Sequence, residues 1–199
     1  GGGNTRSEYS ELWQLLDPAD QLYLIMQDTP TSNPLPSTNV SEMLELTCQV
    51  KDENRKAFLF LELLKKLDPS PQSVHWPKLL AIMLELTGTS FSTQSNHTVE
   101  AFHLILKRMP EELIPEHFNK LFQWAIKYQS PYFRRLTLAV PSQMVDSVFQ
   151  KLDKKDQLYI LLNTDLTLDF DIESFIKQID EHDAKNIPTL IAVHLKLTD

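Results

Sequence analysis

Six histidines are the side chains whose type best suits acid–base or metal chemistry: His75, His97, His103, His117, His182 and His194. A helical zinc site needs two histidines four residues apart on one face, with a glutamate between them in the hydrolytic enzymes. No two of the six histidines have that spacing, and a chain with one cysteine has no thiolate metal centre. The sequence therefore predicts structural or surface histidines, no metal site and no cofactor.

The single cysteine and one acidic run have residue types that occur in catalytic or metal sites, but the surrounding sequence does not fit such a site. Cys48 ends an apolar stretch, 43–48, where a buried small side chain is expected, whereas a nucleophilic thiolate needs an accessible, electropositive environment. The acidic run lacks the central glycine and the spacing of a calcium-binding loop, so we expect helix caps and solvated charge at Asp165, Asp169, Asp171 and Glu173. We therefore predict no catalytic residue and no enzyme activity.

Glycine is nearly absent. It occurs four times, and three of those residues are the leader Gly1–Gly3, so the rest of the chain contains only Gly88. Loops that cradle phosphates or dinucleotides need glycine for positive φ angles and for close approach of the backbone. The composition therefore excludes P-loop, Rossmann and kinase sites, and no small-molecule substrate is evident. We interpret the leader as an appended remnant and expect residues 1–5 to be disordered.

One stretch, residues 122–135, combines residue types that recur at binding surfaces. It holds five of the eighteen aromatic residues and three of the nineteen basic ones. Aromatic and arginine side chains are enriched in interface hot spots and in base-stacking platforms. We expect Phe122 and Phe133 to lie in the core, and we take the rest as candidate partner-binding residues: Trp124, Tyr128, Tyr132, Arg134 and Arg135. The alternative is that these aromatics are also core and that the arginines cap a helix or are solvated.

The elements that must position these residues are helical by their apolar spacing. Apolar residues recur at three- and four-residue intervals in 55–67 and 116–128, as one face of a helix requires. Prolines stand where these patterns break, because proline fits the first turn of a helix, where its missing N–H has no partner. Two continuous apolar runs, 22–26 and 159–162, are compatible with either a strand or a buried helix.

Short phrases repeat along the chain. Residues 13–23 (WQLLDPADQLY) and 149–159 (FQKLDKKDQLY) agree at seven of eleven positions, and both begin with an aromatic residue. A weaker copy within 67–72 preserves Leu-Asp-Pro and the glutamine. These copies predict that the same kind of helix junction is built more than once.

A second echo has a period of 31 residues, since Pro110 lies eight residues before Phe118 and Pro141 lies eight residues before Phe149. Periods of about 30 to 45 residues that hold two helices are typical of α-solenoids, in which each helix pair stacks on the next to bury its apolar face. The chain thus resembles HEAT-like and armadillo-like repeats. This resemblance implies an all-α fold, an irregular right-handed α-solenoid-like stack of about ten to twelve helices.

The domain organisation follows from the same pattern. We expect a single helical repeat-like domain over residues 6–199, because helical spacing continues through nearly all of it. Two polar stretches, 29–38 and 87–96, are rich in proline, serine, threonine or asparagine, and we expect flexible loops there.

Net charge and cysteine usage limit the partners and the compartment. The chain has a formal charge of −8 and a pI near 5.2, so nucleic acid is not expected as the main partner, although a local basic patch could still bind one. No stretch approaches 18 uninterrupted apolar residues, so no membrane span is predicted. One cysteine cannot form an internal disulfide, and we predict an intracellular, reducing compartment, the cytoplasm or nucleus.

A helical-repeat surface without reactive groups predicts a non-catalytic interaction or scaffold module that binds another protein or a peptide. Two alternatives stay open. One is an accessory helical domain of a larger nucleic-acid-associated complex. The other is a host-directed effector domain of an intracellular bacterium, since helical repeats with Gln and Asn but without glycine resemble those of such effectors as well as those of eukaryotic scaffold proteins.

Overall fold

The computed structural model describes residues 10–28, 37–67, 71–88, 95–164, 168 and 170–194. All regular structure within these ranges is helical, with twelve α-helices and no strand, which confirms the all-α fold. The two runs that were compatible with a strand both lie inside helices. Residues 1–5 and the central parts of the two expected loops, 29–36 and 89–94, lie outside the described ranges.

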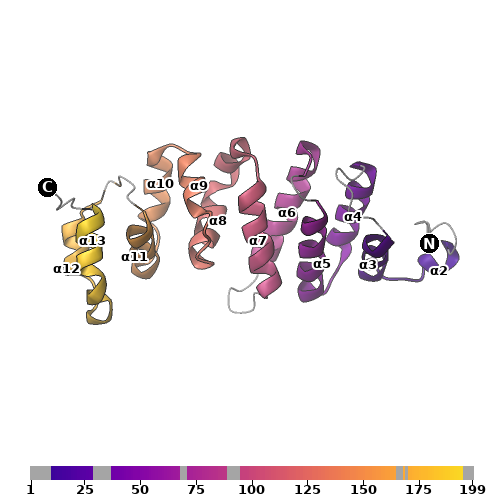
Figure 1. Cartoon of the computed structure of the whole chain (residues 1–199), viewed down its shortest axis with the longest axis horizontal. Coiled ribbons are helices and arrows are strands. Elements are labelled where there is room, and N and C mark those ends of the chain that lie inside the picture. Colours follow the sequence, from indigo (N-terminus) through magenta and orange to yellow (C-terminus); the bar gives the residue numbers. More distant parts are fainter. Residues whose placement is uncertain are drawn as a thin grey trace. The chain divides into compact units, whose positions relative to one another are not determined.

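The chain forms two compact units, Gly1–Met109 and Pro110–Asp199. Unit 1 contains α2 (Ser10–Trp13), α3 (Pro18–Asp28), α4 (Ser37–Gln49), α5 (Glu53–Lys66), η1 (Ser73–His75), α6 (Trp76–Thr87) and α7 (Asn96–Arg108) (Figure 1). Unit 2 contains η3 (Glu111–Leu113), α8 (Ile114–Lys127), α9 (Phe133–Leu138), α10 (Ser142–Phe149), α11 (Lys154–Asn163), α12 (Ile172–Lys177), η4 (Glu181–Asn186) and α13 (Ile187–His194). No helix within the described ranges is both long and apolar enough to cross a bilayer.

Unit 1 is held together by contacts between alternate helices as well as between neighbouring ones. α3 packs against α4 and α5, α4 packs against α5 and α6, and α7 packs against both α5 and α6. Each of these helices contributes a fully buried side chain, among them Leu22, Met43, Phe60, Leu79 and Phe102. Burial of such a side chain contributes about 1.5–3 kcal/mol, so the apolar faces of the helices account for most of their mutual stabilisation.

Unit 2 packs α8 against α9 and α11, and α11 against α13. Its core is rich in phenylalanine. The rings of Phe118 and Phe122 stack with centroids 5.0 Å apart, and Phe170 meets Phe149 at 4.9 Å and Phe175 at 5.3 Å, both edge to face. Such pairs add about 0.5–1.5 kcal/mol beyond the area that they bury. The predicted core position of Phe122 is confirmed, and so is that of Phe133.

The repeated eleven-residue phrase forms the same helix junction in both units, which we call the N-terminal corner (residues 13–23, between α2 and α3) and the C-terminal corner (residues 149–159, between α10 and α11). An aspartate caps the second helix of each corner. The Asp17 carboxylate accepts a hydrogen bond from the Asp20 backbone N–H, and Asp153 accepts one from the Asp156 N–H, both at 2.8 Å. Such caps pair an N–H group that the helix itself leaves unpaired.

A glutamine side chain then ties the second helix of each corner to the end of the first. The Gln21 amide donates to the Trp13 backbone oxygen at 2.8 Å, and the Gln157 amide donates to the Phe149 oxygen at 2.9 Å. In both corners the same oxygen also accepts the backbone N–H three residues further on. The phrase therefore encodes one physical junction. The weaker copy within 67–72 has its central residues, 68–70, outside the described ranges.

The second echo also has a structural counterpart. Pro110 and Pro141 are extended residues that precede a helix, and their carbonyl oxygens accept the N–H three residues later, at 3.1 and 3.0 Å. Phe118 and Phe149 are both buried. Within the apolar stripe 55–67, Phe58 departs from the pattern, because it is 38% exposed and its ring lies edge to face with His97 at 5.3 Å.

Candidate functional site

The end of α8 carries the first two residues of the predicted partner-binding stretch. The rings of Trp124 and Tyr128 are in contact, with centroids 5.3 Å apart. Tyr128 is only 9% exposed, and its burial raises the pKa of the phenol. It lies seven residues after Leu121 and three after Ala125, on the face of α8 that these two buried residues share. Trp124 is half-buried. Trp124 therefore supplies accessible aromatic surface, and Tyr128 supports it from the core.

The chain reverses after α8 through a tight helix end. Gln129 has a φ of 51°, in the left-handed region that residues other than glycine seldom adopt. Its N–H donates to the Ile126 oxygen at 3.0 Å, and the Ser130 N–H donates to the Ala125 oxygen at 2.8 Å, which together make a Schellman motif. The Ser130 hydroxyl accepts the Tyr132 N–H at 3.2 Å. This turn sets where Tyr132 and the following helix begin.

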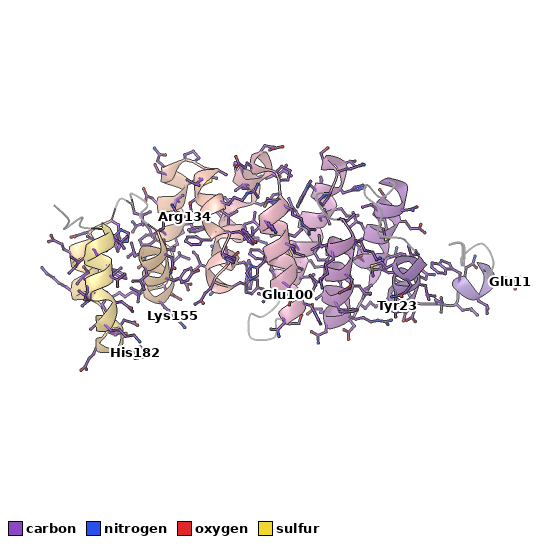
Figure 2. The ribbon with its side chains drawn as sticks, in the orientation of Figure 1. Glu11, Tyr23, Glu100, Arg134, Lys155 and His182 are labelled. Atoms are coloured by element: carbon purple, nitrogen blue, oxygen red, sulfur yellow. The ribbon has the colours of Figure 1, made fainter. Side chains whose placement is uncertain are left out.

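The short helix α9 has one buried and one accessible face. Phe133 and Leu136 are buried, whereas Arg134 is exposed and Leu138, four residues later on the same face, is 77% exposed. Arg135 is half-buried, as is Tyr132 before it. We call the accessible residues Trp124, Tyr132, Arg134, Arg135 and Leu138 the α8–α9 surface (Figure 2 labels Arg134). Because α8 packs against α9, these side chains belong to neighbouring helices.

Charge in the segment that contains this surface differs from that of the whole chain. Residues 117–155 contain only two acidic residues against seven basic ones: Lys120, Lys127, Arg134, Arg135, Lys151, Lys154 and Lys155. Six of the seven are exposed, and Arg135 is half-buried. Leu138 and this local imbalance were both missed by the sequence reasoning. Counting charges in a sliding window, rather than over the chain, would have found the imbalance.

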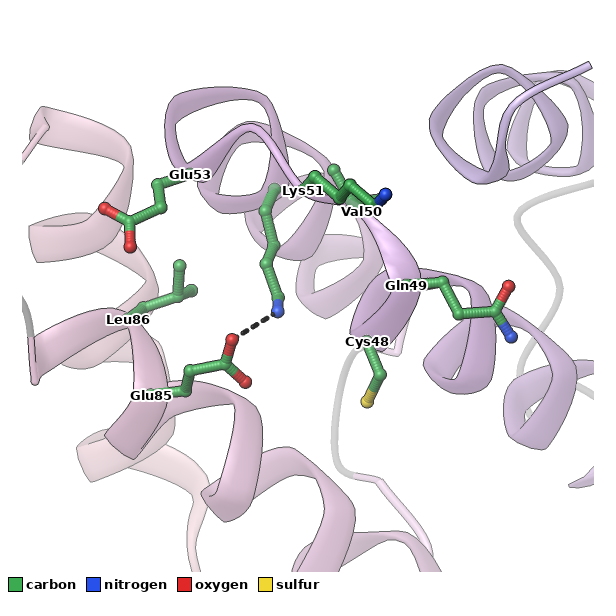
Figure 3. A pocket seen from close by; sticks show the side chains of 8 residues that line it. Cys48, Gln49, Val50, Lys51, Glu53, Glu85 and Leu86 are labelled. Atoms are coloured by element: carbon green, nitrogen blue, oxygen red, sulfur yellow. Dashed lines mark hydrogen bonds and ion pairs between the residues drawn. The ribbon is translucent and has the colours of Figure 1, made fainter.

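A second candidate site is a cavity of about 370 Å³ in unit 1. Three elements build it: the end of α4 and the loop after it, the first turn of α5, and the end of α6 (Figure 3). Its lining is Cys48, Gln49, Val50, Lys51, Glu53, Lys56, Glu85 and Leu86. Most of these side chains reach solvent at the rim, but Val50, Lys56 and Leu86 are buried.

The Lys56 side chain is the unusual member of this lining. It is 4% exposed, and its ammonium forms an ion pair with the 66%-exposed carboxylate of Glu85 at 2.8 Å, the dashed line in Figure 3. A buried ammonium loses several kcal/mol of hydration free energy, and an ion pair with further hydrogen bonds is needed to offset this loss. Sequence reasoning missed Lys56, although it lies three, four and seven residues before Leu59, Phe60 and Leu63, and so shares their buried face.

Cys48 departs in part from its predicted place. It is half-buried rather than buried, and Figure 3 shows its thiol beside the cavity. Burial raises the pKa of the thiol, while Lys78 and Lys56 act in the opposite direction. At neutral pH the thiol is therefore protonated and adds no charge to the cavity. Lys78 in turn pairs with Glu45 at 2.8 Å, which links α6 to α4.

Of the remaining candidates, Asp171 has the helix-capping role that was predicted for the acidic run. Asp171 caps α12 by accepting the N–H groups of Glu173 and Ser174 at 3.1 and 3.2 Å. The hydrogen bond from the Ser174 hydroxyl, followed by those from the two N–H groups, lowers the pKa of the Asp171 carboxyl. Asp165 and Asp169 lie outside the described ranges. Burial lowers the pKa of His75 and of His103. Across the described residues, no group of three or more His, Cys, Asp or Glu is placed to hold a metal ion.

Comparisons with protein families, with curated proteins and with solved structures found no match to this chain.

Proposed function

We propose that the chain is a non-catalytic helical-repeat module that binds an acidic segment of another protein through the α8–α9 surface. The observation that carries the proposal is the accessible face of α9, where Arg134 and Leu138 lie one turn apart. The half-buried Tyr132 directly precedes this helix, and the half-buried Trp124 is on α8, which packs against it. Burial of a side chain such as Leu138 by a partner would contribute about 1.5–3 kcal/mol. Guanidinium groups next to it give the partner a charge preference.

The packing of unit 1 supports the repeat-like architecture. Contacts between α3 and α5, α5 and α7, and α4 and α6 join each helix to the next but one. Stacked helix pairs make such contacts, because each pair buries its apolar face on the following pair. The recurrence of the same corner in unit 2 fits this scheme. We interpret the whole as an irregular, right-handed α-solenoid-like stack that acts as a scaffold.

Local charge supports an acidic partner. Electrostatic attraction in physiological salt decays over about 8 Å, so a partner responds to the side chains that it meets and not to the net charge of −8. In residues 117–155, the segment that contains the α8–α9 surface, the charged side chains are mainly basic. An acidic protein segment with apolar anchors complements both the cations and Leu138, whereas a nucleic acid complements the cations and the aromatics alone.

Selection from a displayed peptide library on the whole protein tests this proposal. We expect enriched peptides to be rich in Asp and Glu around one or two apolar residues. The double variant Arg134→Ala with Leu138→Ala should weaken their binding at least about tenfold in fluorescence anisotropy, because it removes both a charge-assisted contact and an apolar one.

A matched control is Lys177→Ala with Leu15→Ala, which changes one exposed cation and one exposed leucine elsewhere in the chain. Peptide affinity should not change in this control. Peptides without acidic residues, or equal losses in both double variants, would contradict the proposal. Salt-sensitive binding of a single-stranded oligonucleotide that competes with the peptides and exceeds their affinity would favour the nucleic-acid alternative instead.

A further inference from the structure

The Lys56 ammonium has donor capacity that the described residues do not use. A lysine ammonium carries three N–H donors, and Glu85 accepts from it at 2.8 Å. Among the described residues, Glu85 supplies the acceptor for this ammonium. The side chain is almost completely buried, so the two remaining donors have access mainly to the cavity that Lys56 lines. A group inside the cavity that brings acceptor oxygens would therefore form hydrogen bonds with donors that are otherwise unused.

The charges of the lining restrict what that group is. The lining residues include two cations, Lys51 and Lys56, and two carboxylates, Glu53 and Glu85. The thiol of Cys48 is protonated, so the lining has no net charge. A simple anion would be attracted by the ammonium groups and repelled by the carboxylates. A ligand that carries one charge of each sign would be complementary to both.

We propose that this cavity binds a free α-amino acid with an apolar side chain. The carboxylate of the ligand accepts hydrogen bonds from the Lys56 ammonium, and its own ammonium lies against the carboxylates of Glu53 and Glu85. The Glu85 side chain is 66% exposed and belongs to the rim, so it can serve Lys56 and the ligand together. This site is separate from the α8–α9 surface and does not depend on the function proposed for it.

The shape of the cavity agrees with a ligand of this size. Its volume of about 370 Å³ is at the lower end of the range for small-molecule sites, roughly 300–1,000 Å³. Val50, Leu86 and the Cys48 thiol supply an apolar part of the wall, which suits an aliphatic side chain. A peptide end carries only one of the two charges, so the free amino acid is distinguished from it by the pair of charges.

Three probes of nearly the same shape separate these contributions. L-Leucine carries both charges, 4-methylpentanoate lacks the ammonium, and 3-methylbutylamine lacks the carboxylate. Each is titrated into the ¹⁵N-labelled whole protein while backbone amide shifts are followed. We expect leucine to cause saturable shifts confined to the cavity, at Val50, Lys51, Glu53 and Leu86, with a dissociation constant of about 1 mM. Each of the two analogues should bind at least about tenfold more weakly, because it loses one charge-assisted contact.

Variants then assign the charges to residues. Lys56→Met keeps the length of the side chain and should abolish the leucine shifts, whereas Lys65→Met, an exposed lysine on the same helix that does not line the cavity, should leave them unchanged. Glu85→Gln still offers Lys56 an oxygen and should weaken leucine several-fold while affecting 4-methylpentanoate little. It is a surface change, so it tests the site even where Lys56→Met does not fold.

Absence of saturable shifts with leucine up to about 20 mM would overturn the proposal, since a ligand matched to both charges should bind well below that concentration. Equal binding of leucine and 4-methylpentanoate would also overturn it, as would leucine binding that survives Lys56→Met.

Discussion

The two corners share a sequence and a hydrogen-bond pattern, yet their surroundings differ. At the N-terminal corner, the Asp20 side chain is 45% exposed and its carboxylate lies 2.5 Å from the Arg55 guanidinium. At the C-terminal corner, the equivalent Asp156 side chain is 18% exposed, and its ion-pair partner Lys127 is 3.9 Å away. The aspartate caps and the glutamine bonds have nearly the same lengths in both.

This difference separates what the phrase determines from what the fold determines. The phrase sets the geometry of the junction, because its hydrogen bonds connect residues within eight positions of one another. The free energy that the junction contributes depends on burial, which comes from helices elsewhere in the unit. The C-terminal corner is the more buried one at its aromatic residue, at its glutamine and at the aspartate that is the third residue of its second helix. Changes at equivalent positions should therefore cost more there.

The largest contrast is expected at the first residue of the corner. Phe149 is fully buried and its ring packs edge to face on Phe170, whereas Trp13 is half-buried. Phe149→Ala should destabilise unit 2 by about 3–5 kcal/mol, the usual cost of emptying a buried aromatic site. Trp13→Ala should destabilise unit 1 by about 1–2 kcal/mol, since less area is lost. Hydrogen exchange of α11 and α3 amides measures each unit separately. Equal losses would mean that burial by the surrounding helices does not determine how much each corner contributes to the free energy of unfolding.

The glutamine bonds give a smaller contrast. Gln157 is buried, and Gln21 is half-buried. Gln157→Met, which removes the donor and keeps the side-chain length, should cost about 1–2 kcal/mol because water cannot readily replace the lost bond. Gln21→Met should cost about 0.5 kcal/mol, since water reaches that site. Urea unfolding of both variants gives the comparison, with Gln123→Met on the exposed side of α8 as the control. A larger loss at Gln21 would contradict the role assigned to burial.

How far the sequence predicts this molecule follows the same division between local and distant contacts. Helices in 55–67 and 116–128 and both corners could be predicted, because their signals are periodicity and caps within a few residues. The placement of Phe122 in the core follows from the same spacing, and the predicted core position of Phe133 is also correct. Tyr128 belongs to the same buried face of α8 as Ala125, and its low exposure could have been predicted from that spacing.

The cavity could not be predicted in this way. Its main contact joins Lys56 to Glu85, which are 29 positions apart and lie on different helices. Periodicity places Lys56 on a buried face, but it does not say which carboxylate meets the ammonium or that space remains beside it. The exposure of Leu138 has the same origin, because it depends on which neighbouring helices do not cover that face of α9.

The aspartate caps should show no contrast, and this sharpens the comparison. Asp17 and Asp153 are both exposed, and both accept a backbone N–H at 2.8 Å. Asp17→Ala and Asp153→Ala should each cost about 1 kcal/mol, the usual value of a helix cap. Asn at either position should restore most of that loss, because its side-chain oxygen caps equally well. Thermal unfolding monitored by circular dichroism is sufficient. Costs that differ more than about twofold would show that the junction is not a self-contained local unit.

The smallest effects, and the only ones expected to differ in sign, are at the third residue of the second helix in each corner, Asp20 and Asp156. Burial, followed by repulsion from Asp153, raises the pKa of the Asp156 carboxyl, and Lys127 opposes this shift. A carboxyl whose pKa is raised in the folded protein favours folding at a pH below its ordinary pKa, and this contribution is lost as the pH rises through the raised value. Asp156→Asn should therefore match the wild type in acid and become more stable than it towards neutral pH.

The Asn variant of Asp20 should have the opposite effect at neutral pH, because the Asp20 carboxylate pairs with Arg55 and Asn would lose that pair. Asp20→Asn should lower stability at neutral pH by less than about 1 kcal/mol, as expected for a surface ion pair, and salt should reduce the loss. Urea unfolding between pH 3.5 and pH 7, a range set by the ordinary carboxyl pKa, measures both variants. Stabilisation by Asp20→Asn, or a loss by Asp156→Asn that grows with pH, would show that burial is not what separates the two corners.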